Sequence, residues 1–227
     1  MSRKAYQRLT LDERRESLME ATLSCVARHG LEGATVRRIT DEAGVTAGLV
    51  RHYFGSKDEL IRNAYAYLIG QLTMRASESA ARSGGSPARQ LRHFLVANMT
   101  RPNLSEDKVS LWATFIGRVR QDRYFADTHR EGYREFLALL EAMIEGVLAD
   151  LGMPHGASLC RRHAIALNAL LDGLWLEGSL NSGLYGQDIL PSLIIEAAER
   201  LLALPGGTLA GADTTDKEQD QSHAMPA

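Results

Sequence analysis

The chain has 227 residues, of which 44% are hydrophobic and 24% are charged, and its formal net charge is −2 at pH 7. This is the composition of a globular protein with length enough for a sizeable core, and no apolar run reaches the ~18 residues that a membrane span requires. The N-terminus lacks the apolar core of a secretory signal, and Cys25 and Cys160 lie far apart, which together favour free thiols in a reducing cytoplasm.

Helical periodicity dominates, and no segment shows the alternation of a strand, so the expected fold class is all-α. Helices are predicted over residues 12–29, 36–43, 46–54, 56–81, 87–100, 106–120, 127–150, 158–180 and 187–204. Gly30 and Gly44 are expected to end the first two helices. Thr35 and Thr46 can cap the next two, and the stretch that begins at Ser56 reads as a capping box.

The third predicted helix contains a glycine, Gly48, at a cost of roughly 1 kcal/mol relative to alanine. On a helical wheel Val50 and Phe54 share the inward face, whereas Gly48 and His52 lie on the opposite face, beside Arg51. A missing side chain at the centre of an exposed face lets another molecule approach the helix axis closely. The alternative is that a glycine in the first turn of a helix is simply tolerated.

The second and third predicted helices have the layout of a helix–turn–helix unit. In such a unit the first helix, here residues 36–43, braces the second across the DNA backbone, and the second, here residues 46–54, enters the major groove. Arg51 carries the donor fork that suits guanine, His52 can donate or accept at a base edge, and Leu49 can contact a thymine methyl. Lys57 suits a phosphate, as do Thr35 and Arg37 at the start of the bracing helix. Basic residues outnumber acidic ones only in the N-terminal part, which favours a polyanionic partner there, although Arg51 taken alone could be an ordinary solvated arginine.

The segment GATVRRITDEAGVTAGLVRHYFGSKDEL resembles the TetR family of bacterial transcriptional repressors, and the resemblance extends from Asp12 to about Ala66. The family pattern is filled by Ala34-Thr35, Ala43-Gly44-Val45, Gly48, Tyr53-Phe54 and Lys57. The resemblance implies a homodimer on a palindromic operator in the bacterial cytoplasm, associated with the nucleoid. The DNA contacts that it implies, together with Leu49 from the wheel, are Thr35, Arg37, Thr46, Ala47, Gly48, Arg51, His52, Tyr53 and Lys57. Leu49 and Arg51 depart from the threonine and tyrosine common in the family, which leaves the operator sequence in doubt.

The expected domains follow from this resemblance and from changes in composition. An N-terminal three-helix DNA-binding domain is assigned to residues 1–57, and the helix over 56–81 links it to the rest. A larger helical domain for effector binding and dimerisation is assigned to residues 58–205. Residues 206–227 contain almost no large apolar side chain and are expected to be disordered.

Two further stretches, LWATFIGRV and ALNALLDGLWLEGSL, resemble the BetI-like, choline-responsive subgroup of the family. Aromatic faces attract cations, and a carboxylate within an apolar run is costly to bury unless something positive or hydrogen-bonding meets it. We therefore consider a cation cage made of Trp112, Phe115, Asp172 and Trp175. The alternative is that the aromatic residues are core and that Asp172 meets an arginine or a backbone amide.

Apolar stripes on the last two predicted helices suggest a four-helix dimer interface across a two-fold axis. Its predicted residues are Leu170, Leu174, Leu193, Ile194, Ala197 and Leu201. The alternative is that these stripes pack within one chain.

The sequence as a whole predicts a ligand-responsive dimeric repressor whose effector is choline or another cation. A regulator of an efflux or catabolic operon with a non-cationic effector is the alternative, and the direction of the effector's action stays open. The histidines are scattered without metal-site spacing and no nucleophile motif occurs, so neither an enzyme nor a metal or other cofactor is expected. A helical binding protein that no longer recognises DNA is a third possibility.

Overall fold

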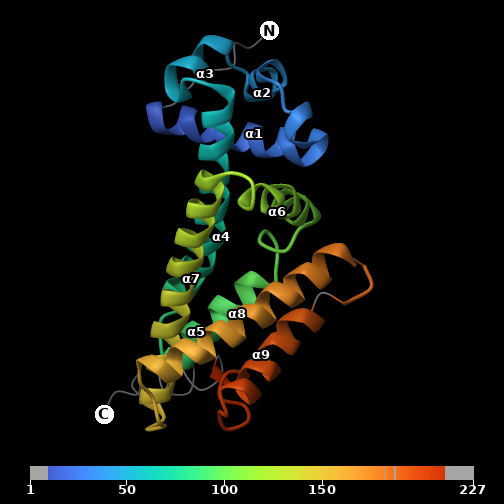
Figure 1. Ribbon diagram of the computed structural model, residues 1–227. Helices are drawn as coiled ribbons and strands as arrows, with labels where there is room; N and C mark the ends of the chain where they lie inside the picture. Colours follow the sequence, from blue (N-terminus) through green and yellow to red (C-terminus); the bar gives the residue numbers. More distant parts are fainter. Residues whose placement is uncertain (1–9, 182, 187, 213–227) are drawn as a thin grey trace, which may run out of the picture. The chain divides into compact units, whose positions relative to one another are not determined.

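The computed structural model describes residues 10–181, 183–186 and 188–212, and every regular element in these ranges is an α-helix (Figure 1). The helices are α1 (Leu11–Gly33), α2 (Val36–Ala43), α3 (Ala47–Phe54), α4 (Lys57–Ser83), α5 (Pro87–Asn98), α6 (Glu106–Val119), α7 (Arg123–Asp150), α8 (Ala157–Leu180) and α9 (Ile189–Leu201). The predicted all-α class is confirmed, and each predicted helix is present with differences only at its ends.

The described chain forms two compact units. Unit 1 comprises residues 10–69 and Ser110–His129, and unit 2 comprises Gly70–Val109 and the described residues from Arg130 onward. The boundaries fall inside α4, α6 and α7, so these three helices contribute to both units. This differs from the predicted division at 57/58, because Tyr65 of α4 and Phe115 of α6 share the core of unit 1.

Local signals explain most helix ends in unit 1. Gly30 has a φ of 68° and bends α1, which continues to Gly33 instead of ending at Gly30. Gly44 has a φ of 65° and ends α2 in the left-handed conformation that glycine adopts without strain. The start of α1 carries a capping box between Thr10 and Glu13 that was not predicted, although the sequence TLDE contains its signature.

The start of α4 has only half of its predicted capping box. The Glu59 amide donates to Ser56 Oγ at 3.1 Å, as expected. The Glu59 carboxylate, however, accepts from Arg62 Nη1 at 2.8 Å. The arginine three residues later therefore competes with the Ser56 backbone for this carboxylate.

Unit 2 is built around α5, α8 and α9, which pack against one another, and α8 and α9 run side by side in Figure 1. Its core also contains Leu209, so the prediction of disorder from residue 206 is wrong for residues 206–212. The Glu199 carboxylate accepts the backbone amides of Leu209 at 2.6 Å, Ala210 at 3.0 Å and Gly207 at 3.1 Å. These bonds fold the segment onto α9; residues 213–227 lie outside the described residues.

Among the described helices, none is long and apolar enough to cross a membrane. Cys25 and Cys160 are both buried free thiols. Burial, together with a hydrogen bond to Glu42, raises the pKa of Cys25 to about 11, so this thiol is unreactive at neutral pH.

Candidate DNA-binding surface and effector region

Helix α3 presents the face that its periodicity predicts. Val50 and Phe54 are buried in the core of unit 1, whereas Gly48, Arg51 and His52 are exposed. Since buried and exposed positions alternate with helical spacing, the exposed face is continuous along this short helix. The predicted orientation of the helix is confirmed.

The space around Gly48 shows that the protein's own packing does not require a glycine. A Cβ built at this position would meet only Thr46 Oγ1, at 3.9 Å, which is an ordinary van der Waals distance. Its φ is not in the left-handed region either. An alanine would therefore fit the unbound protein without strain.

Two polar groups on α3 are available to a partner. Arg51 is exposed, and its guanidinium has neither a hydrogen bond nor an ion pair among the described residues. The His52 ring lies edge-on to the Tyr53 ring, with centroids 5.0 Å apart. Thr46 begins the helix without a side-chain capping bond, which leaves its hydroxyl unused by the helix.

The start of α2 adds a second exposed group. Thr35 Oγ1 accepts the Arg38 amide at 3.3 Å and so caps the helix as predicted. The Arg37 side chain is almost fully exposed and its Nε lies 3.8 Å from Asp41 Oδ2. An exposed pair at this distance contributes little, so Arg37 can exchange its partner for a phosphate at small cost.

Three of the predicted contacts are less exposed. Leu49 and Tyr53 are half-buried against the core of unit 1. Lys57 is also half-buried, and its Nζ donates to the Leu31 carbonyl at 3.3 Å. All the predicted DNA contacts lie in unit 1, on α2 or α3, at the N-caps of these helices or, for Lys57, at the first residue of α4.

The predicted cation cage is divided between the two units. Trp112 and Phe115 belong to unit 1, whereas Asp172 and Trp175 belong to unit 2. Phe115 is fully buried, and its ring centroid lies 4.8 Å from that of Tyr65. The prediction of Phe115 as a ligand contact is therefore wrong: the residue is part of an aromatic core.

Asp172 stands at a hydrogen-bonded cluster between α7 and α8. Its Oδ2 accepts from the Tyr133 hydroxyl at 2.7 Å and from Asn168 Nδ2 at 3.2 Å. Desolvation by the surrounding protein raises the pKa of Asp172, and the two hydrogen bonds oppose this rise. Among the described residues no lysine or arginine pairs with this carboxylate. The sequence offered no signal for Tyr133, because its helix turn is remote from the stretch that contains Asp172.

The indole ring of Trp175 is fixed by a hydrogen bond from its ring nitrogen. Its Nε1 donates to the Asn103 carbonyl at 2.9 Å, and the ring packs against the core of unit 2. Asn103 is itself buried; its side chain donates to the Leu72 carbonyl at 3.4 Å and accepts from Lys108 Nζ at 3.2 Å. Desolvation, and then the charge of Arg75, lowers the pKa of Lys108 to about 8. Asn103 thus joins α4, α6 and α8. The sequence gives no signal for this role, because Asn103 lies in the connection between α5 and α6.

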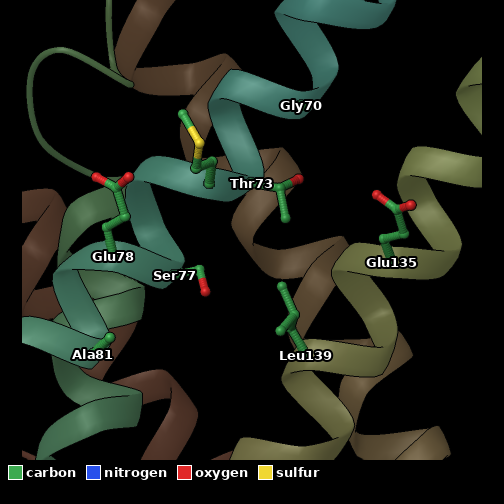
Figure 2. A pocket seen from close by; sticks show the side chains of 8 residues that line it. Gly70, Thr73, Ser77, Glu78, Ala81, Glu135 and Leu139 are labelled. Atoms are coloured by element: carbon green, nitrogen blue, oxygen red, sulfur yellow. The ribbon is translucent and has the colours of Figure 1, made fainter.

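Among the described residues of unit 2 there are a groove and a larger cavity. A groove of about 320 Å³ runs between α4 and α7, where Thr73 and Ser77 point toward Leu139 while Glu78 points away (Figure 2). A larger cavity of about 550 Å³ lies where the end of α5, the start of α6 and the loop after α8 meet. No group of His, Cys, Asp and Glu side chains in the described ranges has the arrangement of a metal site.

The residues predicted for the dimer interface, which lie on α8 and α9, differ in their exposure. Ile194 is 0% exposed in the core of unit 2, so its prediction as an interface residue is wrong. Leu170, Leu174 and Leu201 are half-buried against the same core, and Ala197 is half-buried as well. Leu193 is 44% exposed. The other large apolar residues exposed on α8, on α9 and in the loop between them are Ile165, Leu180, Leu184 and Ile189.

Comparison with known protein families gives two matches that do not overlap. Residues 87–203 match the family of BetI-type transcriptional repressors (C-terminal part), and residues 18–64 match the tetR family of bacterial regulatory proteins. An HTH-type transcriptional regulator BetI from Stenotrophomonas maltophilia (strain R551-3) is 30% identical over 175 residues, which cover 77% of this chain and 86% of the relative.

Solved structures show the same likeness. A protein described as a transcriptional regulator from Pseudomonas aeruginosa PAO1 is 31% identical, with a TM-score of 0.73 over 93% of this chain and 97% of that chain. A protein described as a transcriptional regulator from Saccharomonospora viridis, solved in complex with choline, has a TM-score of 0.68. It is 17% identical and the match covers 83% of this chain and 96% of that chain, so this second likeness is one of fold.

Proposed function

The chain belongs to the TetR family of bacterial transcriptional repressors and to its BetI-type branch, and from this premise we propose that it acts as an effector-controlled homodimer on a palindromic operator. The observation that carries the proposal is the exposed face of α3, where Gly48, Arg51 and His52 lie together while Val50 and Phe54 anchor the helix from behind. A helix held in this way can enter a major groove without disturbing the core beneath it.

Each side chain on this surface has a role that its chemistry suits. The unpaired Arg51 guanidinium suits bidentate bonds to guanine, and the exposed His52 ring suits a neighbouring base edge. Arg37, Thr35 and Lys57 suit phosphate oxygens, which fix the position of the protein on the duplex without reading sequence.

In this proposal two copies of the chain form a dimer whose two-fold symmetry matches that of a palindromic operator. The exposed apolar residues Ile165, Leu180, Ile189 and Leu193 are the support for this, because water-exposed leucines and isoleucines on neighbouring helices favour a self-complementary interface. Two α8–α9 pairs would then form a four-helix bundle.

A cationic effector is supported by Asp172. Its carboxylate accepts from Tyr133 and Asn168, has no basic partner among the described residues, and belongs to an exposed residue that a cation can reach. The choline complex of the fold relative from Saccharomonospora viridis agrees with this chemistry. In this proposal Trp175 is the neighbouring aromatic residue on the same helix, and the role of Trp112 stays a prediction.

Helices α4, α6 and α7 provide the connection between effector and DNA, since each contributes residues to both units. Within unit 1, Arg62 of α4 donates to Asp122 Oδ2 at 3.2 Å, and Asp122 accepts the Tyr124 amide at the start of α7 at 2.9 Å. An effector that favours one arrangement of these helices changes operator affinity by no more than its differential affinity for the two states.

Fluorescence anisotropy on a labelled fragment of the gene's own promoter tests the proposal. Arg51→Ala should remove about 1–3 kcal/mol of discrimination between operator and random DNA. Lys57→Ala should instead weaken both alike and flatten the salt dependence. The control Arg82→Ala removes an exposed arginine from the far end of α4 and should change neither.

Choline is then added to the preformed complex. We expect millimolar choline to change operator affinity, and Asp172→Asn to abolish this response while leaving affinity without choline intact. Unchanged binding in both Arg51→Ala and Lys57→Ala would refute the assignment of α3. A choline response that survives Asp172→Asn would refute the assignment of the effector site.

A further inference from the structure

The cavity of about 550 Å³ in unit 2 has a feature that its packing does not explain. Ser179 on α8 lines it and is only 3% exposed, yet its hydroxyl has no hydrogen-bond partner among the described residues. Buried hydroxyls are nearly always satisfied, because leaving one unsatisfied costs about 1–3 kcal/mol. Ser179 is the penultimate residue of α8, so its hydroxyl could also have bonded the carbonyl one turn earlier, and it does not.

The volume and the walls suit a small molecule. Sites for such ligands commonly measure about 300–1,000 Å³ and are lined by apolar groups with a few polar ones. Met99, Leu104 and Leu190 provide apolar wall, while Thr100, Ser105 and Tyr185 add polar groups. Close packing on one side is set by Gly178, where a Cβ would overlap the Leu190 side chain.

The charged groups at the cavity favour one sign. Glu106 lies in the first turn of α6, where a carboxylate is stabilised by the helix N-terminus. Arg101 also lines the cavity but belongs to no helix, and none of the described residues forms an ion pair or hydrogen bond with its guanidinium. Arg101 is exposed, so its guanidinium is free to pair with an anionic ligand at the edge of the cavity.

We propose that this cavity is a second ligand site, distinct from Asp172, that takes a small amphipathic monocarboxylate. Its apolar body lies against Met99, Leu104 and Leu190. Its carboxylate pairs with Arg101, and the Ser179 hydroxyl donates to one of its oxygens. The site stands beside the first turn of α6, a helix whose later residues Leu111 and Phe115 belong to the core of unit 1.

Three probes with the same apolar body test the proposal by calorimetry on the full-length protein: hexanoate, 1-hexanol and hexyltrimethylammonium. We expect hexanoate to bind about 10-fold more tightly than hexanol, because a charge-assisted bond is roughly twice as strong as a neutral one. Arg101→Gln should reduce this preference to within about 2-fold without changing the affinity for hexanol.

Ser179→Ala should not lower the thermal stability of the unliganded protein, but it should weaken ligand binding. Because the hydroxyl is unsatisfied in the unbound protein, its removal should leave the unliganded Tm unchanged or raise it. The same change should weaken both hexanoate and hexanol by about 5-fold or more, the loss of one ligand hydrogen bond. Ser158→Ala, an exposed serine at the start of the same helix, is the control and should affect neither measurement.

Several results would overturn the proposal. They are equal binding of hexanol and hexanoate, a preference for hexyltrimethylammonium, no heat with any probe at 10 mM (a concentration of the order at which ligands this weak still bind), or an unchanged hexanoate affinity in Ser179→Ala. Operator binding and the choline response are measured on the same variants. Because Arg101→Gln and Ser179→Ala should leave both intact, failure of the carboxylate site is distinguishable from failure of the proposed repressor function.

Discussion

Gly48 is a position at which the proposed DNA contact and the stability of the helix favour different residues. In the unbound protein the residue is exposed and its surroundings accept a methyl group, yet glycine costs helix stability. This loss of helix stability is explained if DNA occupies the space that a Cβ would fill. Arg51 and His52, on the same exposed face, are then brought closer to the bases.

Gly48→Ala should therefore separate stability from binding. We expect the free energy of unfolding to rise by up to about 1 kcal/mol, because alanine is the better helix former and the added Cβ meets nothing closer than Thr46 Oγ1 at 3.9 Å. Operator affinity should fall at the same time. Gly70→Ala, an exposed glycine inside α4 with nothing near its added Cβ, is the matched control and should raise stability alone. If Gly48→Ala bound the operator as well as the unchanged protein, a close approach at this position would be excluded.

Helix α9 depends on the segment that follows it. Glu199 is buried beneath residues 206–212, and three backbone amides donate to its carboxylate. Burial alone would raise the pKa of Glu199, but the amides of Ala210, Gly207 and Leu209 stabilise the ionised form and hold the pKa below its ordinary value of 4.5. The Glu199 side chain therefore holds residues 206–212 against α9.

Glu199→Gln should destabilise the protein by about 1–2 kcal/mol at neutral pH, since charge-assisted bonds become neutral ones. The folded-state pKa lies below the unfolded one, so the contribution of Glu199 is complete above the ordinary pKa of 4.5 and disappears as pH falls through the folded-state value. Thermal unfolding of both proteins from pH 7 to pH 3 measures this (a range that spans the ordinary carboxyl pKa values), and the Tm difference should shrink toward acid pH. The control Glu196→Gln removes an exposed carboxylate one turn earlier and should change Tm little. A Tm difference independent of pH would contradict the role of the ionised carboxylate.

The protein is proposed to function as a homodimer, and the exposed apolar residues of α8 and α9 form the proposed interface. Leu193 at 44% exposure is representative. In an isologous interface each residue is buried twice, once on each subunit, so a single substitution acts twice on the dimer.

Leu193→Glu should raise the dimer dissociation constant by about 100-fold or more, because two leucines each lose roughly 1.5–3 kcal/mol of burial. Sedimentation velocity over a range of protein concentrations measures the change, and operator affinity should fall with it. Leu151→Glu, which alters a leucine of 40% exposure just after α7, is the control and should remain dimeric. Dimers that persist in Leu193→Glu would place the interface elsewhere.

The sequence by itself determined the helices, the two buried residues of α3 and the family, because helical period, caps and the helix–turn–helix pattern are all properties of neighbouring residues. Only the tertiary structure decided which apolar stripes are core. Ile194 and Phe115 are as apolar as an interface or pocket residue must be, and their burial depends on segments distant in the chain. The same reason applies to Leu209, whose order depends on the Glu199 carboxylate. Helical periodicity locates the apolar face of a helix in the sequence. Whether that face packs against the same chain, a second copy or a ligand depends on which part of it other segments of the fold already bury.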